Sequence, residues 1–159
     1  MKLLKHTVLI CTIMLLSANL GTWNVFAEET TPPVETTIVT ENMDAAGLIM
    51  TYSLQITCSP KKVSISANTL GTETMAKIGF KNIEIQRSSN GSSGWTKELD
   101  LSDDIATNTL VHDKVSEKHN VAGGYYYRVK LDHYAKETGW FFPSSQSITN
   151  YSNVIWIPV

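Results

Sequence analysis

The most constraining feature of this sequence is a regular alternation of side chains between Leu48 and Cys58. In the stretch LIMTYSLQITC, every second position is apolar or weakly polar, and the positions between them are mostly polar. Successive side chains of a β-strand point to opposite faces, so this spacing predicts a strand with one face buried against a core. The residues expected on the core face are Leu48, Met50, Tyr52, Leu54, Ile56 and Cys58.

Further strands are predicted along the rest of the chain, in KVSISANTL, AKIGFKNIEIQRSS, WTKELDL, TLVHD, YYYRVKLDHY and YSNVIWIPV. Alternation places Val63, Ile65 and Ala67 on one face, Ile83 and Ile85 on one face, and Tyr125, Tyr127, Val129 and Leu131 opposite Tyr126, Arg128, Lys130 and Asp132. Turn-forming residues separate the first of these strands from one another. Asn90-Gly91, within the turn Ser88–Gly94, is typical of a tight hairpin. Residues 101–108 are expected to form a loop and residues 114–124 a connection. No segment has a helical stripe. The pattern predicts an all-β fold, a single antiparallel β-sandwich of about seven strands.

The first 27 residues have the pattern of a secretory signal peptide. A short basic start precedes the apolar run TVLICTIMLL, and Val25-Phe26-Ala27 fits the small-residue rule for cleavage before Glu28. Residues 28–46 are rich in Thr, Glu and Pro, and are expected to form a flexible tether. The sandwich domain is expected to span residues 47–159.

Removal of the signal peptide takes Cys11 with it and leaves Cys58 as the only cysteine. A single cysteine in an exported chain cannot form an internal disulfide, so the domain must be held together by burial of apolar surface. We expect Cys58 to act as a small buried hydrophobic residue at the end of its strand. The alternative is a reactive or intermolecular thiol.

The charge of the mature chain argues against nucleic acid as a partner. Loss of Lys2 and Lys5 from 13 basic residues leaves 11 against 15 acidic ones, a formal charge of −4. No basic patch or arginine-rich run is present.

The apolar run of the signal is too short to span a bilayer comfortably, and no membrane span is expected after its removal. We expect release into the medium; the sequence does not indicate an oligomeric state.

Three segments make the second half of the chain resemble a bacterial fibronectin type III domain. A strand ending in Arg87-Ser88 is followed by Trp95 at the opening of the next strand. A Gly-x-Tyr-x-x-Arg-Val stretch ends at Val129, and a Tyr-Ser-Asn-Val stretch begins at Tyr151. The resemblance covers residues 78–159. The whole chain is also similar to an uncharacterised family of short secreted proteins of Gram-positive bacteria, which implies no activity.

The resemblance implies a structural role for Tyr125. In the family pattern it is the tyrosine-corner residue, buried, with its hydroxyl bonded to backbone in the preceding connection. One departure concerns the second strand, which usually carries a buried tryptophan in that family. KVSISANTL has none, so the packing of the first two strands is left open.

Residues with the spacing of a catalytic or metal site are not apparent. Asp100, Asp103 and Asp104 do not have the spacing of an EF-hand loop, and a solvated loop is the better interpretation. The histidines lack zinc-ligand spacing. His112-Asp113 has no accompanying nucleophile elbow, and no phosphate-binding or dinucleotide motif occurs. We therefore expect no metal, no cofactor and no enzymatic activity.

The run Trp140-Phe141-Phe142 is the strongest candidate for a binding element. In an extended chain these side chains cannot all face one way, so at least one is expected to be exposed. Trp140 and Phe142 are expected on one face and Phe141 on the other, unless a bulge at Gly139 re-aims them. Two roles that do not exclude each other are open: packing of the rings across a long β-ribbon on Ile148, and a ligand anchor at a loop tip.

Two classes of function follow from these residues. In the first, the protein is a non-enzymatic binding module for a protein or cell surface. In the second, it binds carbohydrate, with Trp140, Trp95 or Tyr134 as a stacking platform for sugar rings. A coplanar pair of exposed rings flanked by polar groups would favour sugar, and a convex apolar patch would favour a protein partner or self-association.

Overall fold

The computed structural model describes residues 39–42, 47–116 and 118–159; the side chains of 39–42 are not described. The predicted signal peptide, residues 1–27, and the first part of the predicted tether lie outside this part of the chain. Eleven strands and no helix occur in the described residues. The strands are β1 (Val39–Asn42), β2 (Ile49–Ser59), β3 (Lys62–Met75), β4 (Lys77–Ser88), β5 (Thr96–Leu101), β6 (Asp104–Ala106), β7 (Thr109–Val115), β8 (His119–Asn120), β9 (Tyr125–Lys136), β10 (Ser145–Tyr151) and β11 (Ile155–Ile157).

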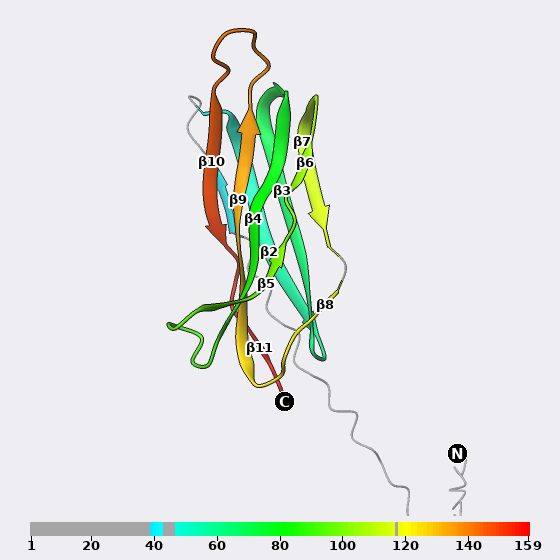
Figure 1. The fold of residues 1–159 in the computed structure, drawn as a ribbon, viewed down its shortest axis with the longest axis vertical. Coiled ribbons are helices and arrows are strands. Elements are labelled where there is room, and N and C mark those ends of the chain that lie inside the picture. The colour runs from blue at the N-terminus through cyan, green and yellow to red at the C-terminus, as the bar shows by residue number, and fades with distance from the viewer. Residues whose placement is uncertain (1–38, 43–46, 117) are drawn as a thin grey trace, which may run out of the picture. The chain divides into compact units, whose positions relative to one another are not determined.

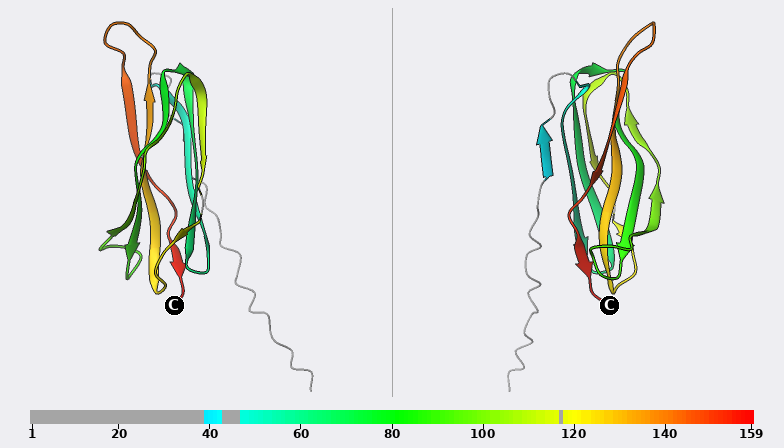
Figure 2. Two further views of the ribbon diagram at one scale, coloured as in Figure 1. Left: turned by 45° about the vertical axis from the view of Figure 1, so that its right-hand side comes forward. Right: turned by 90° about the vertical axis from the view of Figure 1, so that its left-hand side faces the viewer.

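The strands form two antiparallel sheets packed face to face (Figures 1 and 2). The first sheet has the order β1-β2-β3-β7, with β8 also paired to β3. The second has the order β10-β9-β4-β5, with β11 also paired to β9 and β6 to β4. All pairings are antiparallel. The predicted antiparallel β-sandwich is therefore confirmed.

The described strands outnumber the seven predicted because short segments pair where loops were expected. β6 lies in the predicted loop 101–108 and pairs with β4, and β8 lies in the predicted connection 114–124 and pairs with β3. The predicted closing strand, residues 151–159, is not continuous: Tyr151 ends β10, and Ile155–Ile157 form β11. Each short strand supplies hydrogen-bond partners for backbone groups of a longer neighbouring strand. The side-chain pattern of the longer strand does not reveal that such a partner is present.

The connection between β4 and β5 is longer than the tight hairpin expected from Asn90-Gly91. β4 ends at Ser88 and β5 begins at Thr96. The Ser88 hydroxyl is buried and accepts the backbone N–H groups of Asn90 and Gly91, each at 3.2 Å. The loop is thus organised by a buried side chain rather than by a two-residue turn.

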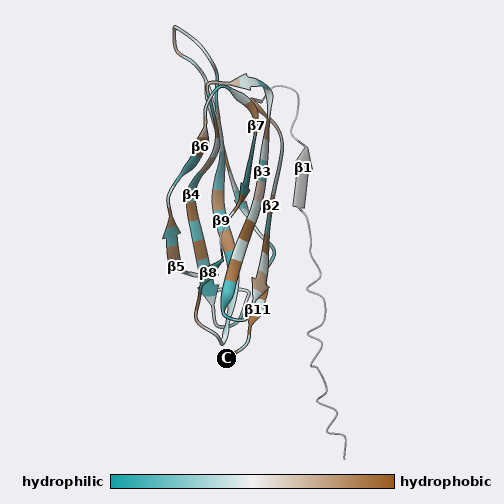
Figure 3. Ribbon diagram, turned by 90° about the vertical axis from the view of Figure 1, so that its right-hand side faces the viewer, coloured by the Kyte–Doolittle hydropathy of each residue, from teal (hydrophilic) through white to brown (hydrophobic). Residues whose placement is uncertain are grey.

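β9 supplies the centre of the core. Its side chains at Tyr127, Val129, Leu131, His133 and Ala135 are completely buried, and each alternates with a half-buried residue on the outer face. β9 is an interior strand, paired with β4 on one side and with β10 and β11 on the other. Figure 3 shows the matching alternation of apolar and polar residues along β4 and β9. The predicted period-two pattern is confirmed for this strand.

The buried apolar side chains fall into two clusters. The main cluster contains Leu54, Ile56, Val63, Ile65, Ala67, Phe80, Ile83, Ile85, Val121, Tyr127, Val129, Leu131, Ile155 and Ile157. A smaller cluster contains Ile49, Tyr52, Met75, Ile78 and Ala135. Ala135 is one residue from the end of β9, so the smaller cluster lies at the end of the sandwich from which the β9–β10 loop emerges.

The predicted alternation in the first long strand fails at its beginning. Ile49 is buried and Met50 is 52% exposed, the reverse of the expected arrangement. The pairing of β2 with β3 shifts between Ile49 and Thr51, which oppose the adjacent residues Gly71 and Leu70. Met50 is therefore the extra residue of a β-bulge. The bulge turns the side chains of the residues before it to the opposite face of the sheet.

Four residues of the segment expected to be a flexible tether form β1. Val39 pairs with Leu54 and Asn42 with Thr51 along the edge of β2. An edge strand has a row of unpaired N–H and C=O groups, which an adjacent extended segment can satisfy. The domain therefore includes at least part of the segment before residue 47.

Polar contacts join the two sheets along both open sides of the sandwich. On one side, the Gln146 side-chain oxygen accepts the backbone N–H groups of Leu48 at 2.6 Å and Ile49 at 2.9 Å. On the other, the Asp104 carboxylate accepts a hydrogen bond from Lys114 Nζ at 2.9 Å and lies 2.8 Å from His112 Nε2. Burial opposes ionisation of Asp104, but the bonds to Lys114 and His112 outweigh it and lower its pKa.

The Tyr-Ser-Asn-Val segment is the point where the last strand changes position. Ser152 is buried, and its hydroxyl accepts the backbone N–H of Val129 at 2.8 Å. The neighbouring Asn153 side chain accepts the backbone N–H of Ile56, at 3.2 Å, from the first sheet. These two side chains satisfy backbone donors where the regular pairing of β10 has ended.

The burial and the hydroxyl-to-backbone bond expected of Tyr125 are found at Tyr127. Tyr127 is completely buried and its hydroxyl donates to the Ala122 carbonyl at 2.7 Å; burial raises its pKa. Tyr125 is half-buried, with the Arg87 guanidinium 4.7 Å from its ring centre. Both residues share the inward face of β9, but Tyr125 opens the strand, where the sandwich encloses its side chain less completely.

Cys58 is the penultimate residue of β2 and packs against the main cluster. It is half-buried rather than fully buried as expected, because β2 ends one residue later at the turn into β3. Its place at the end of the strand is as predicted.

A buried polar pair connects the two sheets near the smaller cluster. The His133 Nδ1 atom and the Thr69 hydroxyl, which come from β9 and β3, are 2.7 Å apart, and both residues are completely buried. The rings of Tyr52 and Phe80 flank the imidazole at centroid distances of 4.7 and 5.6 Å. Burial lowers the pKa of His133 from 6.5 to about 4.

We predict that Tyr127→Phe lowers the free energy of unfolding by about 0.5–1.5 kcal/mol, because the Ala122 carbonyl loses its donor. Tyr125→Phe is the matched control and should change it by less than about 0.5 kcal/mol. Denaturant unfolding of both variants measures the difference. A larger loss in Tyr125→Phe would return the corner role to Tyr125.

The second prediction concerns pH. The unfolded chain protonates His133 near pH 6.5, whereas the folded chain does so only near pH 4, so stability should fall as the pH drops through this window. The full loss is about 3 kcal/mol, the free-energy equivalent of the difference between these two pKa values. NMR titration of the folded-state imidazole tests the cause directly; a midpoint near 6.5 would contradict it.

Candidate functional site

The loop between β9 and β10 projects beyond the ends of the neighbouring strands (Figures 1 and 2). The last paired residues of the two strands are Lys136 and Ser145. Beyond them the Glu137 backbone N–H donates to the Ser144 carbonyl at 3.0 Å, and the Ser144 N–H donates to the Glu137 carboxylate at 3.1 Å. The base of the loop is therefore fixed by both main-chain and side-chain bonds.

All three aromatic residues lie at the tip of this loop. Trp140, Phe141 and Phe142 are 92%, 81% and 97% exposed. The prediction that at least one is exposed is confirmed. We refer to these three residues as the aromatic tip.

The expected alternation of the three rings on a β-ribbon is wrong. Residues 137–144 are outside both strands, and Phe142 has a φ of +50°, a left-handed conformation uncommon for bulky side chains. A Cβ added at Gly139 would lie 3.3 Å from Pro143 Cβ, so the loop turns back on itself there. The rings do not pack on Ile148, which instead lies against the smaller core cluster.

Trp95 and Tyr134, the other predicted binding aromatics, lie outside the loop, Trp95 just before β5 and Tyr134 within β9. Both are half-buried. The Arg128 guanidinium carbon is 4.3 Å from the Trp95 ring centre and 4.4 Å from that of Tyr151. Lys81 Nζ lies 3.5 Å from the ring centre of Tyr134. A cation therefore lies against one face of each ring, an arrangement that itself contributes about 0.5–1 kcal/mol at exposed sites.

Arg128 organises a second aromatic surface on the outside of the second sheet. Its Nε donates to the Gln86 side-chain oxygen at 2.9 Å, and burial lowers its pKa. Beside it, the rings of Tyr126 and Trp156 are 4.8 Å apart. The sequence pattern placed Tyr126 and Arg128 on the outer face of their strand, but it did not identify this stack, which joins β9 to residues before β5 and in β10 and β11.

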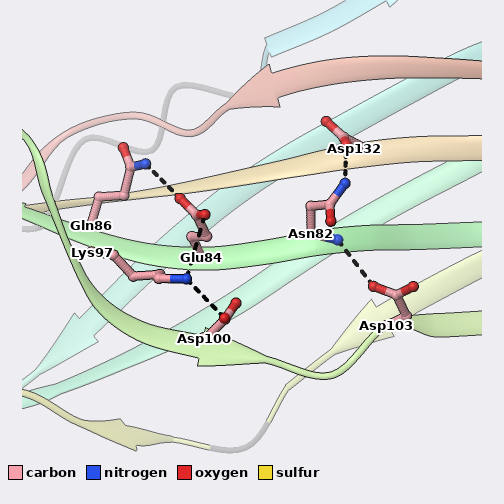
Figure 4. Close-up of polar contacts among 7 residues, drawn as sticks. All are labelled: Asn82, Glu84, Gln86, Lys97, Asp100, Asp103 and Asp132. Carbon is pink, nitrogen blue, oxygen red and sulfur yellow. Dashed lines mark hydrogen bonds and ion pairs between the residues drawn. The ribbon is translucent and has the colours of Figure 1, made fainter.

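Polar side chains fill the rest of this outer face (Figure 4). The Asn82 amide donates to the Asp132 carboxylate at 2.6 Å, and its backbone N–H donates to Asp103 at 3.0 Å. Lys97 Nζ donates to Asp100 at 2.8 Å. With Asp104 bound to His112 and Lys114, the three aspartates considered for calcium each contact different partners. Within the described residues, no group of three or more His, Cys, Asp or Glu side chains could hold a metal ion.

His112, considered for catalysis with Asp113, and the buried His133 both have structural contacts. His112 lies against Asp104 and not beside a nucleophile, and its ring is 5.5 Å from that of Phe80. His133 is enclosed between the sheets with Thr69. These contacts explain both residues through packing and hydrogen bonding alone.

Comparison with models of protein families finds no family that matches, and comparisons with curated proteins and with solved structures find no significant match. Over the part of the chain that the structure describes, no helix is long and apolar enough to cross a membrane. The candidate site therefore rests on the geometry of the aromatic tip.

We predict that Trp140→Ala, Phe141→Ala and Phe142→Ala each change the free energy of unfolding by less than about 0.5 kcal/mol, because exposed side chains contribute little to packing. Phe80→Ala, which removes a completely buried ring, should cost about 3–5 kcal/mol. Thermal or denaturant unfolding of the four variants makes the comparison. A loss above about 2 kcal/mol in the tip variants would make the tip part of the core.

Proposed function

We propose that this protein is a secreted, non-enzymatic binding module that attaches to a protein or cell surface through the aromatic tip. The observation that carries the proposal is the exposure of Trp140, Phe141 and Phe142 on a loop whose base is fixed. Fully burying a side chain of this size is favourable by about 1.5–3 kcal/mol. The sandwich leaves that surface unburied, so it is available to a partner.

We further propose that the domain is of the fibronectin type III or immunoglobulin-like type. Two antiparallel sheets and the Tyr127 hydroxyl bond to the Ala122 carbonyl support this assignment, since that bond is a hallmark of such sandwiches. In these folds, recognition residues commonly lie in the loops at the ends of the sandwich. The β9–β10 loop is such a loop.

The carbohydrate-binding alternative has less support. A sugar platform needs free, coplanar rings, whereas one face of Trp95 and one face of Tyr134 already lie against Arg128 and Lys81. Trp140 is 92% exposed on the β9–β10 loop, whereas Trp95 lies before β5 and Tyr134 lies within β9. The convex apolar tip favours a protein or cell-surface partner.

The test uses the fluorescently labelled mature chain, from Glu28 onward, and intact cells of the producing organism. Replacing Trp140, Phe141 and Phe142 together with Ser should weaken cell binding at least tenfold. The matched control replaces the exposed residues Met50 and Val115 with Ser and should bind as the wild type does.

Equal binding by the tip variant and the wild type would refute the proposal. A glycan array incubated with the same proteins tests the alternative. Binding to a glycan that is lost on Tyr134→Ala but kept in the tip variant would establish the carbohydrate function instead.

A further inference from the structure

The aromatic tip has a shape that suits a fluid partner better than a preformed pocket. Each of its three rings is more than 80% exposed, so solvent surrounds each ring on nearly every side. A rigid protein would need a deep cavity to enclose all three. A lipid layer encloses a convex apolar tip without any matching shape.

The composition of the loop also fits the interfacial region of a bilayer. No charged residue occurs between Thr138 and Ser144, so entry of the tip requires no charge to leave water. Tryptophan in particular is enriched where the hydrocarbon core meets the headgroups, because its ring is apolar with one polar N–H. The backbone at the base is satisfied by the bonds between Glu137 and Ser144.

Positive charge lies at the base of the loop. Lys77 and Lys136 are cross-strand partners at the adjoining ends of β4 and β9. With the tip inserted, their ammonium groups would lie near the level of headgroup phosphates, which attract basic side chains beside a membrane surface. The neighbouring Glu137 carboxylate is engaged by the Ser144 N–H.

From this geometry we propose that the partner of the aromatic tip is the lipid surface of a membrane, into whose interface Trp140, Phe141 and Phe142 insert. The inference rests on the proposed function and names its partner. The loop inserts from one side, as a peripheral anchor, and does not span the bilayer.

Vesicles of phosphatidylcholine with phosphatidylglycerol are the probe, and cosedimentation with the mature chain measures partition. We expect the wild type to sediment with the vesicles and the triple Ser variant of the tip to lose at least tenfold in partition. The Met50 and Val115 double Ser variant should keep it. Lys77→Glu with Lys136→Glu should weaken binding severalfold on these vesicles and much less on pure phosphatidylcholine.

Brominated lipids locate the inserted residue. They should quench the tryptophan fluorescence of the wild type, whereas Trp140→Phe should still bind but lose the quenching. The other tryptophans of the mature chain lie toward the start of β9, Trp156 paired with Tyr126 and Trp95 against Arg128. The loop follows the end of that strand, so about 25–30 Å separates both rings from the lipid. Equal quenching in Trp140→Phe would overturn the proposed orientation and with it the inference.

Other partners of the aromatic tip would give different results in these experiments. Tip-dependent binding to cells without binding to lipid vesicles, abolished by protease treatment of the cells, would identify a protein partner and overturn the lipid inference while leaving the proposed function intact. A tip-dependent dimer without vesicle binding would identify a second copy of the chain and also overturn it. If neither cells nor vesicles require the tip, both proposals fail.

Discussion

The structure depends on the burial of one strand between two sheets. β9 runs from Tyr125 to Lys136, pairs with β4, β10 and β11, and places five consecutive inward side chains completely out of solvent. With Cys58 free and no disulfide in the described residues, this burial has to supply what a cross-link supplies in many small exported domains. The inward side of β9 makes the core, and the end of β9 sets the position of the loop.

A buried histidine between the two sheets is costly unless it has a partner. Thr69, on the opposite sheet, supplies one for His133, so the polar pair also fixes how the two sheets face each other. At the sides, Gln146 and Asp104 make the equivalent connections. The sandwich is thus closed by polar contacts between the sheets and at both sides, and the β9–β10 loop takes no part in these contacts.

The outer face of β9 and the loop after it use aromatic residues differently. Trp95 and Tyr151 lie on either side of Arg128 and are satisfied within the fold. Trp140, Phe141 and Phe142 have no comparable neighbours and are the most exposed aromatic side chains of the described chain. This difference separates aromatic residues that stabilise the domain from those available to a partner, and it favours attachment at the tip over a sugar platform on the sheet.

The sequence predicted the parts of the fold that follow from local periodicity. Alternation identified the inward residues of β9, together with Val63, Ile65 and Ala67 of β3 and Ile83 and Ile85 of β4, because within a regular stretch the direction of a side chain depends only on the strand's own period. It could not identify the bulge at Met50, which depends on the pairing of β2 with β3. Nor could it distinguish Tyr125 from Tyr127, which share a face and differ only in depth. In the candidate site, exposure of the tip was predicted, but the left-handed Phe142 and the Arg128 stack depend on loop geometry and on distant strands.

The central claim is that the sandwich is complete without the aromatic tip and that the tip serves attachment alone. The most direct test replaces residues 138–143 with Asn-Gly, which suits a two-residue hairpin between Glu137 and Ser144. The account predicts a free energy of unfolding within about 1 kcal/mol of the wild type and complete loss of surface binding. A chain that unfolds, or that still binds its surface, would contradict the account.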